Sequence, residues 1–176
     1  DSAHKLAILS SLAFGEKMDY EGIPVEGINN LELMDLTIGA ELGYIVKLLS
    51  VAKKTEKGIS LFVRPVFIHK EHPLAWVSGS FNAISVYGDT VGHTMYYGRG
   101  AGGAPTASAI VADVISAAQG TLQQRFQSMG IWPDRTEKAK QLPVGENIGR
   151  FYIRMIAHDQ PGVLAGVASI LSEHNI

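Results

Sequence analysis

The pattern of apolar and polar positions predicts two helices at the start of the chain. Residues 1–14 carry apolar side chains around most of a helical cylinder, with polar residues confined to the first turn, which predicts a buried helix. Gly15 is expected to end it. Asn29, followed three residues later by Glu32, indicates a capping arrangement for a second helix that stops at Gly43.

The pattern then changes to the β-branched, apolar runs that are typical of strands. Residues 44–52 and 59–68 are two such runs, separated by the polar, glycine-ended segment KKTEKG, which predicts a β-hairpin. Residues 81–87 and 94–97 flank the segment GDTVG and predict a second hairpin.

The second half of the chain predicts helices and a linker. Residues 104–118 form a helix of small side chains with Pro105 near its first turn, whereas residues 119–148 have little periodicity and indicate a linker. Residues 151–157 predict a strand, and residues 162–174 predict a helix. The expected fold class is therefore α+β: an α/β-type domain with a mixed β-sheet covered by helices, then a linker and a βα unit.

Composition and charge narrow the possible functions. The 176 residues are 46% hydrophobic, which is enough for a packed core, and they include no Cys, which excludes disulfides and thiolate zinc sites. The formal net charge of -2 gives no basic surface for nucleic acid. No apolar run reaches the roughly 18 residues of a membrane helix. We expect a cytoplasmic protein with a small-molecule ligand, no nucleic-acid or membrane partner and no metal site.

Asp1 and Lys5 are the first candidates for chemistry. They lie four residues apart in DSAHK and therefore share one face of the first predicted helix. A carboxylate and an ammonium placed there can bind a zwitterionic amino acid and move a proton to or from its oxygen. Spacing alone favours an ordinary surface ion pair. His4 is not a candidate, because a lone His is more often solvated or structurally bonded.

Two glycine-containing turns are the other candidates. Gly98, Gly100 and Gly103 match GxGxxG ahead of a helix, where a ligand can approach backbone N–H groups. The βαβ unit of a dinucleotide site is missing, so a tight turn before a close-packed helix remains equally open. The segment DQPG at 159–162 joins the last strand to the last helix, with Pro161 near the helix start, and a plain βα unit is its simpler interpretation.

Four stretches taken together resemble the substrate domain of bacterial homoserine dehydrogenases: DSAHKLAILSSLAFG, LGYIVKLLSVAKK, HPLAWVSGSFNAISVYGD and YYGRGAGGAPTASAIVADV. They follow the order found in that family. We therefore assign residues 1–119 to a substrate-binding and catalytic domain and residues 120–148 to a linker. The tail, with HDQPGVLAGVASIL, is similar to the start of an ACT regulatory domain, here truncated at 149–176. The chain has no initiator Met and stops after a helix where a strand is expected, so we interpret it as a fragment.

The resemblance implies the NAD(P)-dependent interconversion of L-homoserine and L-aspartate 4-semialdehyde, on the route to threonine and methionine. Lys5 corresponds to the family's catalytic lysine at the substrate oxygen, and Asp1 to the substrate-binding aspartate beside it. Gly100, Ala101 and Gly102 map onto the loop that approaches the nicotinamide. The cofactor, NADP or NAD, is bound mainly by the family's Rossmann domain, which this chain lacks, so we expect the fragment alone to be inactive.

The tail carries the expected regulation. Asp159, Gln160 and Gly162 are implied to bind an amino-acid effector, threonine being the usual one in the family. The resemblance also implies a homodimer or a higher homo-oligomer. The competing hypothesis is a non-catalytic amino-acid-sensing or dimerisation module, in which Asp1 and Lys5 are surface residues. Agreement over several stretches favours the enzyme, and a nucleotide-binding domain encoded ahead of Asp1 would distinguish the two.

Overall fold

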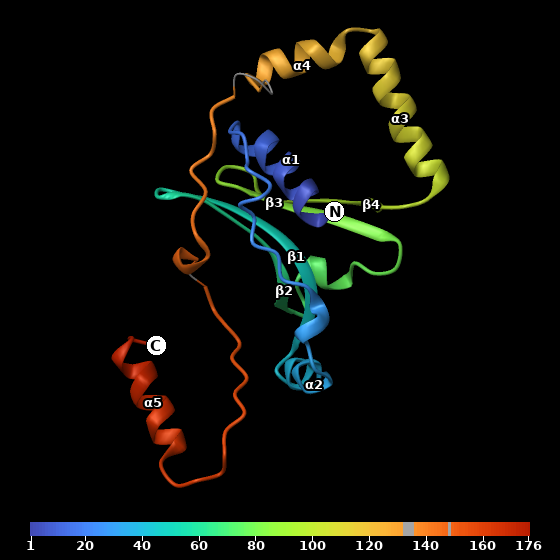
Figure 1. Ribbon diagram of the computed structural model, residues 1–176. Coiled ribbons are helices and arrows are strands. Elements are labelled where there is room, and N and C mark those ends of the chain that lie inside the picture. Colours follow the sequence, from blue (N-terminus) through green and yellow to red (C-terminus); the bar gives the residue numbers. More distant parts are fainter. Residues whose placement is uncertain (132–135, 148) are drawn as a thin grey trace.

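Two β-hairpins form the centre of the computed structural model, which describes residues 1–131, 136–147 and 149–176 (Figure 1). Strands β1 (Tyr44–Thr55) and β2 (Gly58–His69) pair antiparallel along their whole length, as do β3 (Phe81–Gly88) and β4 (Gly92–Arg99). Both predicted hairpins are confirmed. The mixed sheet is wrong: the described strands form two separate antiparallel pairs, because each strand turns back directly on its sequence neighbour.

The predicted helices are present with shifted starts and ends. The helices of the described residues that span more than two turns are α1 (Ser2–Phe14), α2 (Leu33–Glu41), α3 (Gly103–Ala118), α4 (Thr121–Met129) and α5 (Val163–Glu173). Gly15 ends α1 with a φ of 71°, and its N–H donates to the Ser11 carbonyl at 3.0 Å, as expected for a left-handed C-terminal glycine.

The start of α2 differs from the prediction. Its N-cap residue is Glu32, and Asn29 lies instead in a short 3-10 turn, Ile28–Asn30. The carboxylate of Asp35 accepts the backbone N–H of Glu32 at 2.9 Å. Glu32, which the sequence analysis placed three residues inside the helix, is thus its N-cap residue. Asp35, three residues further on, takes the role in the capping box that was predicted for Glu32.

The core lies between one face of α1 and the β1–β2 hairpin. Ile59, Leu61 and Val63 alternate along β2, so they point to the same side of the strand, and each is at most 2% exposed. They pack in one cluster with Ala3, Leu6 and Ala7 of α1. The predicted burial of α1 is confirmed for one face and wrong for the other, because the hairpin covers only one side and Ile8 is 62% exposed.

The described residues of the predicted linker, 119–148, include a helix and a segment bonded to β2. Thr121–Met129 forms α4, between Gly120 and Gly130, both with positive φ. Farther on, the chain runs beside β2: the N–H of Ile59 donates to the Lys140 carbonyl at 2.8 Å, and the N–H of Leu142 donates to the Ile59 carbonyl at 2.9 Å. The sequence analysis missed this helix because Gln, Arg, Ser and Thr make up most of its nine residues and leave few apolar positions to show a helical period. Residues 132–135 and 148 of the predicted linker lie outside the described residues.

The tail contains the predicted helix without the predicted strand. Residues 151–157 adopt no strand, because no described segment pairs with their backbone. Helix α5 begins at Val163, after Gly162 with a φ of 93°, so Pro161 precedes the helix and does not occupy its first position. Figure 1 shows α5 at the end of a long extended segment, set apart from the hairpins.

Much apolar surface stays uncovered in this chain. The accessible surface of 13406 Å² is well above the roughly 8300 Å² expected of a compact monomer of this mass. Helix α3 buries none of its side chains. Exposed apolar residues of α3 and of the β3–β4 hairpin include Tyr87, Ile110 and Val114. Among the helices of the described residues, none combines the length and apolarity required to span a membrane.

Candidate functional site

Asp1 and Lys5 form an ion pair at the start of α1. The Nζ of Lys5 lies 2.6 Å from the Oδ2 of Asp1, one helical turn away, and the two side chains are 59% and 80% exposed. Helical spacing puts positions 1 and 5 opposite the face that packs on β2. An exposed pair of this kind stabilises a helix by only a few tenths of a kcal/mol, so both charges are free to meet a ligand.

The neighbouring His4 has a structural contact. Its ring stacks on that of Tyr20, with centroids 3.8 Å apart and planes 13° from parallel. The stack ties the first turn of α1 to the loop that follows the helix.

The glycine loop joins β4 to α3. The N–H of Gly100 donates to the Ser80 carbonyl at 3.0 Å, and a Cβ on Gly100 would lie 2.7 Å from the Oδ1 of Asn82. The side chain of Asn82 therefore occupies the space that any larger residue at position 100 would need. Gly102 has a φ of 125°, which side chains other than that of glycine rarely adopt.

The start of α3 suits the approach of an anion or of a planar ring. Gly102 is the N-cap residue and offers no side-chain cap, and a Cβ on Gly103 would meet no atom within 4 Å. The first N–H groups of any helix have no partner inside it, and the helix dipole favours negative charge there. A Cβ on Gly102 would lie 3.3 Å from the Cδ of Pro105, so the open space at the start of α3 is the one beside Gly103.

The structure leaves the three predicted sites apart. Among the described residues, no hydrogen bond or ion pair joins the Lys5 pair to the glycine loop, or either of them to residues 159–162. In the turn before α5, Asp159, Gln160 and Gly162 are exposed, and the carbonyl of Gln160 accepts the N–H of Val163 at 3.3 Å. Two hollows in the described surface, of about 100 and 220 Å³, include none of these residues. Both are smaller than the roughly 300 Å³ of a typical ligand site.

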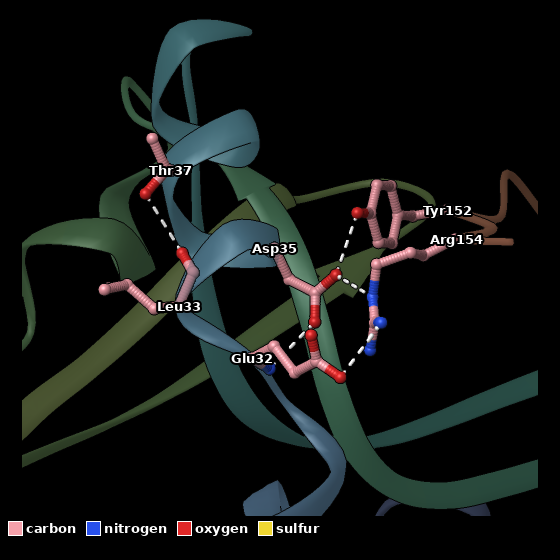
Figure 2. A network of polar contacts seen from close by, with 6 residues as sticks. All are labelled: Glu32, Leu33, Asp35, Thr37, Tyr152 and Arg154. Atoms are coloured by element: carbon pink, nitrogen blue, oxygen red, sulfur yellow. Dashed lines mark hydrogen bonds and ion pairs between the residues drawn. The ribbon is translucent and has the colours of Figure 1, made fainter. Parts of the chain in front are cut away.

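A polar network that the sequence analysis missed joins α2 to the tail (Figure 2). We call it the α2–tail network; its members are Glu32, Asp35, Tyr152 and Arg154. Asp35 is 3% exposed, and its Oδ1 accepts both the Tyr152 hydroxyl and the Arg154 Nε–H at 2.8 Å. A second guanidinium nitrogen of Arg154 lies 3.0 Å from the Oε1 of Glu32. The buried carboxylate is therefore bound from its own helix and from residues more than a hundred positions away.

These contacts set the protonation of the network. The hydrogen bond from the Glu32 N–H, then those from Tyr152 and Arg154, hold the pKa of the Asp35 carboxyl below its usual value. The carboxylate in turn raises the pKa of the Tyr152 hydroxyl. One sequence signal pointed here: Arg154 is the lone charge in the apolar run 151–157.

Comparison with known proteins identifies the family. The family model described as homoserine dehydrogenase matches residues 1–115. The chain is 43% identical to the homoserine dehydrogenase of Pseudomonas aeruginosa and 41% identical to that of Neisseria gonorrhoeae, and each alignment covers the whole chain. It spans about two fifths of the length of these relatives, 41% in both cases.

Solved structures give the same result. The homoserine dehydrogenase of Thiobacillus denitrificans aligns with 98% of this chain and 40% of its own, with a TM-score of 0.79 and 37% identity. That of Staphylococcus aureus aligns with 67% of this chain and 30% of its own, with a TM-score of 0.63 and 37% identity. The comparisons give no support to a separate sensing module. By sequence over its whole length and by fold, the chain belongs to the homoserine dehydrogenase family.

Proposed function

We propose that the protein containing this chain is an enzyme that interconverts L-homoserine and L-aspartate 4-semialdehyde with NAD or NADP, on the route to threonine and methionine. The observation that carries the proposal is the exposed Asp1–Lys5 pair, which lies in the DSAHK stretch of the segment matched by the family. Neither side chain is committed to the core, so both can contact a zwitterionic substrate.

Lys5 is the proposed proton-transfer group. In the oxidative direction, the neutral amine of Lys5 takes the proton of the substrate hydroxyl while the carbon that bears it loses a hydride, and a carbonyl forms. In the reductive direction, the ammonium polarises the aldehyde oxygen and donates the proton to the developing alkoxide. Asp1, 2.6 Å from the Lys5 nitrogen, orients the ammonium and accepts the substrate's α-ammonium group.

The nicotinamide cofactor supplies and accepts the hydride when bound. Gly100, Ala101 and Gly102 are the residues that we propose lie beside it. The open space beside Gly103 would admit a flat ring in close approach to the backbone, whereas the Asn82 side chain fills the space beside Gly100.

The decisive test is Lys5→Ala in the complete enzyme. Turnover should fall by about 10²- to 10⁴-fold, because proton transfer is lost, while stability changes little at an exposed position. Lys54→Ala is the matched control: it removes an exposed ion pair of similar length, 2.8 Å to Glu16, away from the proposed site. A Lys5→Ala enzyme within threefold of the unchanged one would show that another group moves the proton.

We further propose that Asp159, Gln160 and Gly162 begin an ACT-type amino-acid site, with threonine as the effector, in a cytoplasmic homodimer or higher homo-oligomer. Their turn is exposed, and the following helix α5 buries none of its side chains, so both are free to meet further parts of a regulatory domain. The effector should change the catalytic site by a coupling free energy of about 1–3 kcal/mol.

Deleting all residues after Leu142 from the complete enzyme should abolish inhibition by threonine and leave catalysis in place. Leu142 itself is retained because its backbone is bonded to β2. Inhibition of the deleted enzyme with an unchanged midpoint would place the effector elsewhere.

A further inference from the structure

Contacts with strand β2 run from Leu142, ahead of the tail, to Tyr152 within it. Leu142 is bonded to Ile59 through the backbone, and the hydroxyl of Ser60 is hydrogen-bonded to the Asn147 side chain. Two ring contacts continue the path toward the end of β2: the guanidinium of Arg64 lies 5.9 Å from the ring of Phe151, and the ring of Phe67 lies 4.8 Å from that of Tyr152. The α2–tail network lies at the far end of this path.

At that end, the Asp35 carboxylate binds both the start of α2 and the tail. The Oδ2 of Asp35 accepts the N–H of Glu32, which closes the first turn of α2, and its Oδ1 accepts the donors of Tyr152 and Arg154. Glu32, the N-cap residue of the same helix, is the second acid that pairs with Arg154. The groups that cap α2 are therefore the same groups that bind the tail.

We propose that Glu32, Asp35 and Phe67 form a docking surface for residues 151–154 of the same chain, and that occupancy of this surface controls the order of the first turn of α2. Residues 151–154 are identified as the occupant because they contact this surface in the structure: the Tyr152 hydroxyl and the Arg154 guanidinium bind the Asp35 carboxylate, and the Tyr152 ring contacts the Phe67 ring. This inference is independent of the proposed catalytic activity.

Charge and burial explain why the two events are linked. With the tail bound, the Arg154 guanidinium balances the nearly buried charge of Asp35 and the half-exposed charge of Glu32. Once the tail leaves, two acids remain at one helix start without their cation, and the Asp35 carboxylate, which has lost its contacts with Tyr152 and Arg154, gains most by turning toward water. A turn toward water takes the carboxylate away from the Glu32 N–H. Release of the tail thus loosens the cap.

Hydrogen exchange of backbone amides in the complete protein tests the link. Tyr152→Phe combined with Arg154→Met removes both tail donors, keeps both apolar stems and leaves α2 unchanged. Amides at 32–36 should exchange about tenfold faster or more, because a hydrogen bond to a charged group is lost. Thr37→Val is the control: it removes a hydrogen bond of the same helix, 3.0 Å to the Leu33 carbonyl, that does not involve the tail (Figure 2). Its exchange at 32–36 should stay within twofold.

Protease cleavage within 149–158 reports the tail in the same samples. The proposal requires faster cleavage together with faster exchange at the start of α2. Faster cleavage with unchanged exchange would overturn the link between the two, and unchanged cleavage would overturn the docking surface itself. Asp35→Asn changes the acceptor of the network in place of its donors. It should also speed cleavage of the tail, since it removes the negative charge that binds Arg154.

Discussion

Gly39 lies where α2 passes over the ring of Phe67. Whether an alanine at position 39 raises or lowers the free energy of unfolding should therefore depend on that ring. A Cβ on Gly39 would lie 2.9 Å from the Phe67 Cδ1 and closer still to Cε1, whereas carbon atoms in contact lie about 3.5–4.0 Å apart. The ring would have to move, and overpacking of this kind costs about 1–3 kcal/mol. Alanine also gains about 1 kcal/mol over glycine inside a helix. Gly39→Ala should therefore lower the free energy of unfolding by about 0–2 kcal/mol.

Removing the ring should reverse the effect. In a Phe67→Ala background the clash disappears, only the helix propensity remains, and Gly39→Ala should raise the free energy of unfolding by up to about 1 kcal/mol. Urea unfolding of the four proteins, followed by circular dichroism, gives both values and a coupling of about 1–3 kcal/mol. An effect of equal sign and size in both backgrounds would refute the reasoning, because the cost would then lie in α2 itself.

Three further predictions concern the glycine loop, the core and the network. Gly102→Val forces a branched side chain onto a φ of 125° at the proposed nicotinamide contact, so the KM for the cofactor should rise more than that for the substrate; equal small changes would favour a purely structural turn. Leu61→Ala empties a site that is 2% exposed and should cost about 2–5 kcal/mol in urea unfolding, against less than about 0.5 kcal/mol for Val91→Ala, whose side chain is 81% exposed. Because the pKa of Asp35 is lowered in the folded protein, its stabilising contribution is complete above the ordinary carboxyl pKa of about 3.9 and is lost as pH falls through the lowered value. Tail cleavage should increase on acidification in that range, and Asp35→Asn should remove the step.

Local patterns predicted those elements whose partners are near in sequence. The polar segment KKTEKG contains the two-residue turn Glu56–Lys57 between two runs that pair with each other, so the first hairpin needed no information from elsewhere in the chain. The end of α1 at Gly15 is likewise a local matter of backbone conformation. The mixed sheet was wrong because a further strand depends on long-range pairing that local patterns do not encode.

The candidate site was predicted only in part for the same reason. Four-residue spacing placed Asp1 and Lys5 on one helical face, and the structure joins them at 2.6 Å. Their proposed chemistry came from resemblance, since an exposed ion pair is the ordinary outcome of such spacing. The structural role of Gly100 escaped the sequence because the atoms that require a glycine belong to Asn82, on the neighbouring strand.

The α2–tail network shows which part of such a contact a sequence can reveal. An arginine in the apolar run 151–157 signals a buried or half-buried acid somewhere in the fold, because an unpaired charge there is costly. The chain offers 17 acidic residues, and composition does not distinguish among them. The helix start does: Glu32 and Asp35 lie on one turn of α2, where the first makes the cap and the second accepts its N–H, so two acids lie close together there. Helix α2 carries no Lys or Arg of its own that could pair with these acids, and Arg154 of the tail is the cation that pairs with both.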